Sequence, residues 1–213
     1  MIQVMLVVIA VSGLLHIISD YKEKWTLTYV FKPLTMIFII GLLVAKADLE
    51  DVYTRWVLAG LIASLIGDIF LMLRPQRFIA GLASFLIAHV LYVLAFYSSV
   101  QGSAISWLAL VFIPFAAIYL VYLWSKLGSY RWPVVGYFMA IGSMLFFASA
   151  LFIVEMSLMS KYALVGALLF ALSDGVLAYR KFVKPFKAGQ AIIMTTYFAA
   201  QVLIALSAVY LWA

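Results

Sequence analysis

Eight long apolar runs, separated by short polar segments, divide this sequence of 213 residues. Hydrophobic residues make up 68% and charged residues 10% of the chain, whereas a soluble domain has about 45–50% apolar and about 25% charged residues. A chain of this length could not bury so much apolar surface in water, so its solvent must be a lipid bilayer. The composition excludes a soluble enzyme, a disordered chain and, because cysteine is absent, a disulfide-stapled secreted domain.

Each run is long enough to cross a bilayer as a helix, which needs about 20 apolar residues. The runs are continuous rather than alternating, which excludes a β-barrel. The first run has no basic start and no small-residue cleavage site, so we expect it to remain as a helix of the mature protein. The sequence therefore predicts an all-α membrane protein with eight transmembrane helices. The predicted spans are 2–19, 32–47, 53–73, 78–99, 104–125, 133–154, 160–180 and 190–212.

The basic residues predict how the chain is oriented in the membrane. Eleven of the fourteen Lys and Arg residues lie in the first, third, fifth and seventh connections. The positive-inside rule places these connections in the cytoplasm and both termini on the non-cytoplasmic side of a cell membrane, or of the inner membrane in a bacterium. The net charge of +6 thus indicates multi-pass orientation rather than nucleic-acid binding, and we expect no nucleic-acid partner.

Two stretches about half a chain apart resemble each other. In each, an Asp is followed by basic residues, then by a Gly, and eight residues after that Gly by His or Tyr. The pattern predicts a single membrane domain, 1–213, built from two parallel four-helix repeats, 1–103 and 104–213, and functional sites often lie between such repeats. Chance similarity between apolar helices is the alternative. The matching pairs are Asp68 and Asp174, Gly81 and Gly189, His89 and Tyr197, and Pro33 and Pro133 at the predicted starts of spans two and six.

Four ionisable residues lie well within the predicted spans, namely His16, Asp68, His89 and Asp174. An intramembrane carboxylate costs about 2.5–3.5 kcal/mol on insertion scales, so it usually faces the bundle interior and serves function. Each Asp lies six residues before an Arg at the cytoplasmic boundary, which predicts an equal depth of about 9 Å for both. Small residues on the same helix faces also favour burial. The alternative is that both acids pair structurally with Lys32 or a nearby Arg.

Two further helices carry a polar face. His89 and Tyr92 are three residues apart, and Tyr197 and Gln201 are four apart, so each pair shares one side of its helix. Lys32 opens the second predicted span on the same side of the membrane as the two acids. For His89, an interhelical hydrogen bond without a chemical role is the alternative to a functional one.

Two buried carboxyl groups in different surroundings can divide the work of hydrolysis, one protonated and the other ionised. Other hydrolytic sites lack their motifs: the sequence has no HExxH, no cysteine and no G-x-S-x-G. An intramembrane aspartyl protease would have G-x-G-D, but Leu65 stands where the first glycine should be. We therefore expect general acid–base chemistry with no metal and no organic cofactor.

Short motifs run in order from the second predicted span to the eighth. They are Lys32-Pro33-Leu34-Thr35, Gly67-Asp68 with Leu71-Met72, Phe78 through Gly81 to Phe85, His89 and Tyr92, Ser173-Asp174, and Thr196-Tyr197-Phe198-Ala199-Ala200-Gln201. Together their order and spacing resemble the YhhN-like lysoplasmalogenase family. The resemblance implies an ether hydrolase that cleaves the vinyl ether bond of a lysoplasmalogen, yielding a fatty aldehyde and glycerophospho-ethanolamine or -choline.

The resemblance thus implies a lipid-metabolising enzyme whose partners are a lysophospholipid substrate and membrane lipid. A transporter that uses the two acids as a proton relay is the main alternative, and a lipid-binding protein without turnover is another. The predicted catalytic residues are Asp68 and Asp174, and the predicted substrate-binding residues are Lys32, His89, Tyr92, Tyr197 and Gln201.

Overall fold

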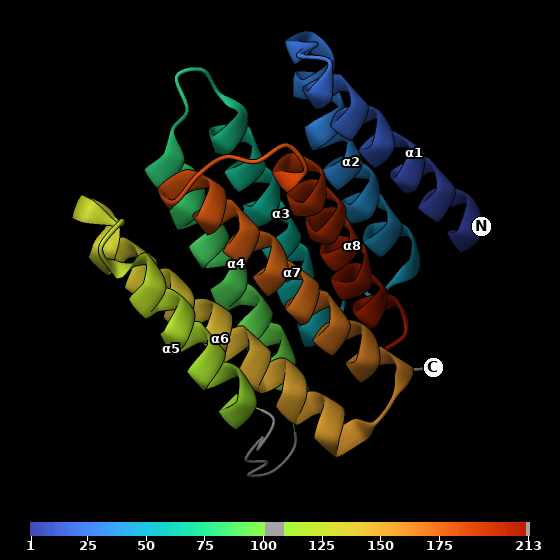
Figure 1. The fold of residues 1–213 in the computed structure, drawn as a ribbon. Coiled ribbons are helices and arrows are strands. Elements are labelled where there is room, and N and C mark those ends of the chain that lie inside the picture. The colour runs from blue at the N-terminus through green and yellow to red at the C-terminus, as the bar shows by residue number, and fades with distance from the viewer. Residues whose placement is uncertain (101–108, 212–213) are drawn as a thin grey trace.

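The computed structural model describes residues 1–100 and 109–211. These residues form eight α-helices and one 3₁₀ turn, η1, and they contain no strand (Figure 1). The helices are α1 (Ile2–Tyr21), α2 (Trp25–Lys46), α3 (Val52–Met72), α4 (Phe78–Ser99), α5 (Ala109–Trp124), α6 (Arg131–Glu155), α7 (Leu158–Phe182) and α8 (Gly189–Val209), and η1 is Gly128–Tyr130.

Seven of the described helices are long and apolar enough to cross a membrane. The eighth, α5, is apolar but shorter, and the part of the predicted span 104–125 that precedes residue 109 lies outside the described residues. The prediction of an all-α, multi-pass membrane protein is therefore confirmed, and the eight-helix count agrees with the structure.

The prediction for the second span was wrong at its start. Helix α2 begins at Trp25, seven residues before the predicted start, and Pro33 lies inside it. Proline removes one helical hydrogen bond, but transmembrane helices tolerate this where other groups satisfy the freed carbonyl. Pro133, by contrast, lies in the first turn of α6, where no amide partner is needed. The two prolines therefore do not both mark helix starts. This one match between the predicted repeats is not kept in the structure.

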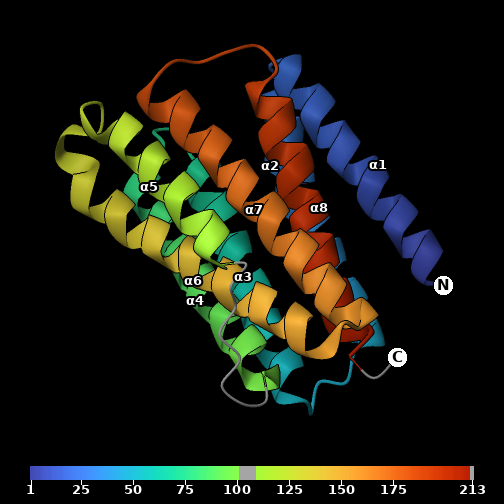
Figure 2. The same cartoon turned by 60° about the horizontal axis from the view of Figure 1, so that its bottom comes forward.

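The helices pack as neighbouring pairs, α1 with α2, α3 with α4 and α7 with α8. Helix α8 is the most buried of the long helices, and it contacts α1, α2, α3 and α7. Helix α6 contacts α4 and α7, and α5 packs on α6 at the edge of the bundle (Figure 2). The core of the molecule therefore lies around α8, α3, α4 and α7.

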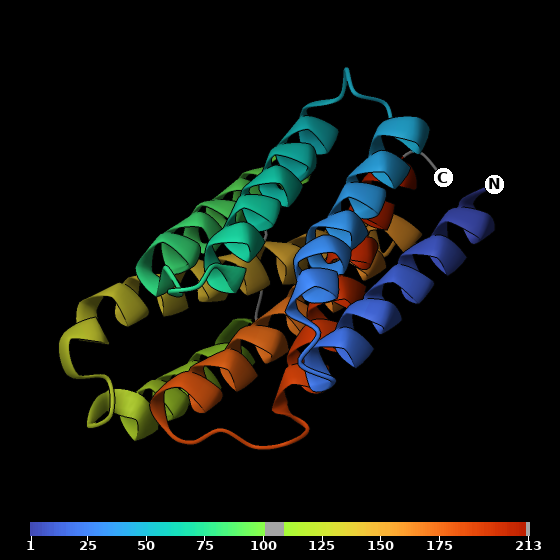
Figure 3. The same ribbon diagram turned by 90° about the horizontal axis from the view of Figure 1, so that it is seen from above.

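The four basic connections gather at one end of the bundle, which we name the basic end. It comprises residues 22–24, 73–77, 125–130 and 183–188. The first turn of α1 and the last turn of α8 lie at the opposite end (Figures 1 and 3). That the basic end faces the cytoplasm stays a prediction.

Glycines bring α3 and α4 close together. A Cβ atom at Gly60 would overlap the ring of Tyr92, and one at Gly67 would overlap the ring of Phe85. The polar face of α4 is therefore pressed against α3, which carries Asp68.

Candidate active site

The first cluster of the site surrounds Asp68 on α3. Asp68 is only 1% exposed, and its Oδ1 lies 3.0 Å from Nζ of Lys32 on α2. The hydroxyl of Tyr197 on α8 donates to Asp68 Oδ2 at 2.6 Å. Three predicted site residues from three helices therefore meet at a buried ion pair.

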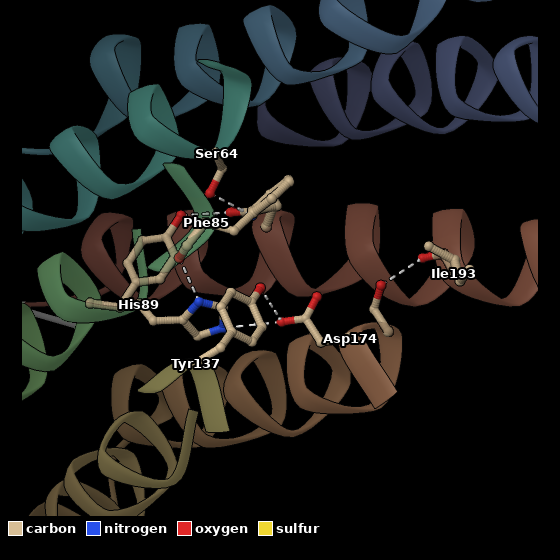
Figure 4. Close-up of polar contacts among 9 residues, drawn as sticks. Ser64, Phe85, His89, Tyr137, Asp174 and Ile193 are labelled. Carbon is tan, nitrogen blue, oxygen red and sulfur yellow. Dashed lines mark hydrogen bonds and ion pairs between the residues drawn. The ribbon is translucent and has the colours of Figure 1, made fainter. Parts of the chain in front are cut away.

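The second cluster surrounds Asp174 on α7 (Figure 4). The hydroxyl of Tyr137 on α6 donates to Asp174 Oδ2 at 2.8 Å. Nε2 of His89 on α4 lies 3.3 Å from the same oxygen, an ion-pair distance if the ring is protonated, although the geometry is not that of a hydrogen bond. Nδ1 of His89 lies 2.6 Å from the carbonyl oxygen of Phe85. Because a carbonyl only accepts, Nδ1 must carry a proton, which leaves Nε2 to face the carboxyl group.

A third cluster links α3, α4 and α8. Tyr92 donates to Oε1 of Gln201 at 2.6 Å, and Nε2 of Gln201 donates to the hydroxyl of Ser64 at 3.0 Å. All three side chains are fully buried. This chain of bonds joins α3, α4 and α8 through the Gln201 amide.

Aromatic rings join the clusters. Phe170 lies 4.5 Å from His89 and 5.6 Å from Tyr197 between ring centroids. Phe85 lies 5.7 Å from Tyr197. Tyr197 bonds Asp68 and His89 faces Asp174, so Phe170, which contacts both rings, brings the two carboxyl groups into one neighbourhood.

Two cavities adjoin this neighbourhood. The first, the apolar cavity, measures about 900 Å³ and lies between α4, α5, α6 and α7, with Asp174 and Tyr137 in its wall. The second, the polar pocket, measures about 280 Å³ and lies at the basic end, with Lys32 and Arg74 in its wall. Leu71 lines both cavities. Asp174 therefore borders the apolar cavity directly, whereas Asp68 reaches the polar pocket only through its partner Lys32.

The equal depth of the two acids below the membrane boundary stays a prediction, because a helix end need not coincide with that boundary. The two acids do differ in their distance from the helix ends. Helix α7 continues past Arg180 to Phe182, so Asp174 lies eight residues before its end, about 12 Å. Asp68 lies four residues before Met72, about 6 Å from the end of α3. Measured from the helix ends, Asp174 is therefore about one turn deeper than Asp68.

The contacts cross between the two predicted repeats. Asp68 of the first repeat contacts Tyr197 of the second, and Asp174 of the second contacts His89 of the first. His89 and Tyr197 were matched to each other in the sequence. The duplication itself stays a prediction, but these contacts place the candidate site between its two halves.

Sequence reasoning missed Tyr137. It is the single Tyr in the predicted span 133–154, and a lone tyrosine hydroxyl group in an apolar span was the one sequence feature that could have indicated a polar contact. Tyrosine is ordinary in a membrane helix, however, so only the crossing of α6 and α7 reveals its bond to Asp174.

Within residues 1–100 and 109–211, His, Asp and Glu do not gather in threes as a metal site would require.

Residues 27–208 match the model of the YhhN family. The chain belongs to this family. The membrane protein YhhN of Escherichia coli O157:H7 is 32% identical to it over 198 residues, which cover 93% of this chain and 95% of that protein. This YhhN-family chain has no match among solved structures.

Mammalian relatives carry an enzyme name. Human lysoplasmalogenase TMEM86B is 38% identical over 157 residues, covering 73% of this chain and 64% of the human protein. Bovine lysoplasmalogenase TMEM86A is 36% identical over 158 residues, covering 72% and 65%. These relatives support a membrane hydrolase and do not favour the transporter.

Proposed function

We propose that this protein hydrolyses the vinyl ether bond of lysoplasmalogens, with Asp174 as the proton donor and Asp68 as the carboxylate that activates water. The observation that carries the proposal is a pair of buried carboxyl groups, of which Asp174 lines the apolar cavity and Asp68 pairs with Lys32 in the wall of the polar pocket. The lysoplasmalogenase relatives support the substrate class.

The different surroundings of the acids support the division of roles. Lys32 lies 3.0 Å from Asp68 and compensates a negative charge there. Among the residues that the structure describes, Asp174 has no Lys or Arg within ion-pair distance, and it borders an apolar cavity, where a neutral carboxylic acid is better tolerated than an anion. His89 faces Asp174 and can share or return its proton.

The cavities orient the substrate. A single-chain lipid fits with its hydrocarbon in the apolar cavity and its phosphate near Lys32 and Arg74. The vinyl ether, written CH₂–O–CH=CH–R, lies between head and chain. Its distal alkene carbon is then nearer the apolar cavity and Asp174, and its oxygen-bearing carbon is nearer Asp68.

The reaction begins with carbon protonation. Asp174 transfers its proton to the distal alkene carbon, and the double-bond electrons form the new C–H bond. The positive charge that develops on the oxygen-bearing carbon is an oxocarbenium ion, which the Asp68 carboxylate stabilises. Carbon protonation is the difficult step in vinyl ether hydrolysis, so the position of Asp174 decides the rate.

Water then completes the reaction. Asp68 accepts a proton as water adds to the oxygen-bearing carbon, which gives a hemiacetal. The hemiacetal loses its hydroxyl proton and breaks its bond to the glycerol oxygen, which gains a proton. The products are a fatty aldehyde and glycerophospho-ethanolamine or -choline, and the acids return to their starting protonation states through His89 and solvent.

The test is aldehyde release from purified protein given 1-alkenyl lysophosphatidylethanolamine. The matched control lipid is the saturated 1-alkyl ether, which lacks the alkene and must yield no aldehyde. In D₂O the product should carry one deuterium on the carbon next to the aldehyde, because that carbon receives the catalytic proton.

Each outcome separates a class of function. Deuterated aldehyde supports carbon protonation, and an aldehyde without deuterium there rejects this mechanism. Intact lipid from well-folded protein rejects the enzyme. Vesicles that hold the protein and move the alkenyl lipid without cleaving it would instead establish the transporter.

A further inference from the structure

The polar pocket contains groups that the proposed reaction does not use. His16 lies in its wall and is 1% exposed, yet among the residues that the structure describes neither of its ring nitrogens has a hydrogen-bond partner. Buried polar atoms are nearly always paired in folded proteins. An imidazole left unpaired in the wall of a pocket therefore indicates a ligand that supplies the partner.

The cations of the pocket suit a phosphate. Lys32 and Arg74 line it together with His16. The Arg74 guanidinium lies 3.2 Å from the ring centroid of Trp25, another wall residue, and this stacking holds the charge in place. Two cations and an imidazole around one small cavity are an anion site.

Asp20 does not fit a site for phosphate alone. It is a half-buried carboxylate in the same wall as Lys32 and Arg74. Within the described part of the chain it makes no ion pair shorter than 4 Å and its side chain accepts no hydrogen bond. A carboxylate repels an anionic ligand, so its presence favours a ligand that also carries a positive group.

We propose that the polar pocket recognises a zwitterionic phosphoamine headgroup, with the phosphate held by His16, Lys32 and Arg74 and the ammonium held by Asp20. The inference rests on the proposed function for its lipid, and it assigns the residues that select the headgroup. Leu71 lines both cavities, so in this proposal the lipid chain enters the apolar cavity past the Leu71 side chain.

Binding without turnover tests the inference. The probes are 1-alkyl lysophosphatidylethanolamine and 1-alkyl lysophosphatidylmethanol of equal chain length. Both are phosphodiesters of equal charge on phosphorus, and only the first has an ammonium group. Neither has a vinyl ether, so titration of the detergent-solubilised protein measures affinity alone, and inorganic phosphate as competitor separates headgroup recognition from capture of the free ion.

The variant Asp20→Asn should weaken the ethanolamine lipid about tenfold and leave the methanol lipid unchanged or tighter, because it removes a charge-assisted partner of the ammonium alone. The matched control is Glu23→Gln, which removes an exposed carboxylate from the same end of the bundle but outside the pocket. It should change neither affinity.

The variant His16→Phe should weaken both lipids to the same extent, and His16→Gln, which keeps a donor, should weaken them less. Thermal unfolding checks that each variant is folded. If Asp20→Asn tightens both lipids together, Asp20 merely offsets the basic charges and the inference is wrong. It is also wrong if the two affinities keep their wild-type ratio.

The function and the inference fail separately. In one outcome, the wild-type protein prefers the ethanolamine lipid, Asp20→Asn abolishes this preference, and the wild-type protein releases no aldehyde from the alkenyl lipid. This outcome rejects the proposed function but supports the headgroup pocket. In the other outcome, the protein releases aldehyde, but its preference for the ethanolamine lipid is the same in wild type and Asp20→Asn. This outcome rejects only the headgroup pocket.

Discussion

Asp68 lies beside an ammonium group, whereas Asp174 lies beside an imidazole in the wall of an apolar cavity. Both carboxyl groups accept a tyrosine hydroxyl, Asp68 from Tyr197 and Asp174 from Tyr137. The tyrosine bond is thus the shared feature, and the second partner is the difference.

The different second partners of Asp68 and Asp174 indicate how one membrane site can hold two acids in two roles. In the proposed mechanism, the Lys32 cation makes Asp68 tolerable as an anion deep in the bundle, whereas Asp174 gives up its proton from the wall of the apolar cavity. The variants below exchange or remove these partners, so each either breaks the contrast or sharpens it.

The largest effect is expected at Asp174. Asp174→Asn removes the proton that the alkene needs but keeps a side chain of the same shape, so turnover should fall about 10²–10⁴-fold. Aldehyde release measures the loss, and Asp48→Asn, in the connection between α2 and α3, is the matched control that should stay active. An Asp174→Asn protein with wild-type turnover would remove this residue from the mechanism.

The next effect concerns stability. Asp68→Asn leaves the buried Lys32 ammonium without its counter-charge, which should cost about 3–5 kcal/mol, besides loss of activity. The double variant Lys32→Met/Asp68→Asn should recover most of that stability and none of the turnover. Thermal unfolding in detergent gives the comparison.

Asp174→Asn is the reference for this experiment, because it removes no partner from a buried cation and should change stability by about 1 kcal/mol. Equal destabilisation by Asp68→Asn and Asp174→Asn would show that the two acids are not in different charge states.

The third effect separates the two tyrosines. Tyr197→Phe removes a bond to a charged carboxylate, worth about 1.5–3 kcal/mol, and Tyr137→Phe removes one to a neutral acid, worth about 0.5–1.5 kcal/mol. Turnover should therefore fall about ten- to a hundredfold for Tyr197→Phe and about two- to tenfold for Tyr137→Phe. The reverse order would exchange the roles of Asp68 and Asp174.

The spans and the rare charges were readable from the sequence because bilayer thickness and the cost of buried charge act on each helix separately. Asp68, His89 and Asp174 stand out on that basis. The start of α2 was missed because Lys32 and Pro33 look like a polar boundary, whereas tertiary contacts bury Lys32 and let the helix begin at Trp25.

The partners of the acids were beyond such reasoning. Lys32 was predicted on the same side of the membrane as Asp68, and their pairing was the structural alternative to a functional role, but Tyr137 was not foreseen near Asp174. Which hydroxyl group reaches Asp174 depends on where α6 crosses α7. Side-chain packing along both helices determines this crossing point. The polar pocket likewise joins α1, α2, α3 and α8, and no local pattern encodes that junction.

The smallest effect on turnover is expected at two glycines that each lie eight residues before an acid, Gly60 before Asp68 and Gly166 before Asp174. A methyl group at Gly60 meets the ring of Tyr92, and one at Gly166 meets Ile204 and lies 3.2 Å from the carbonyl oxygen of Ala200. Each Gly→Ala variant should lose about 1–3 kcal/mol of stability through overpacking, read from thermal unfolding. Gly41→Ala is the control, because nothing lies within 4 Å of its added methyl group.

Activity then distinguishes the two glycines. Gly60→Ala displaces Tyr92 from Gln201 and should lower turnover per folded molecule, because this bond holds α4 and α8 in register beside Asp68. Gly166→Ala presses on the backbone of α8 about one turn away from Tyr197 and should lower stability with less effect on turnover. If turnover falls more in Gly166→Ala, the register of α7 and α8 controls the chemistry, and Asp174 depends on its own hairpin rather than on contacts that cross between the halves.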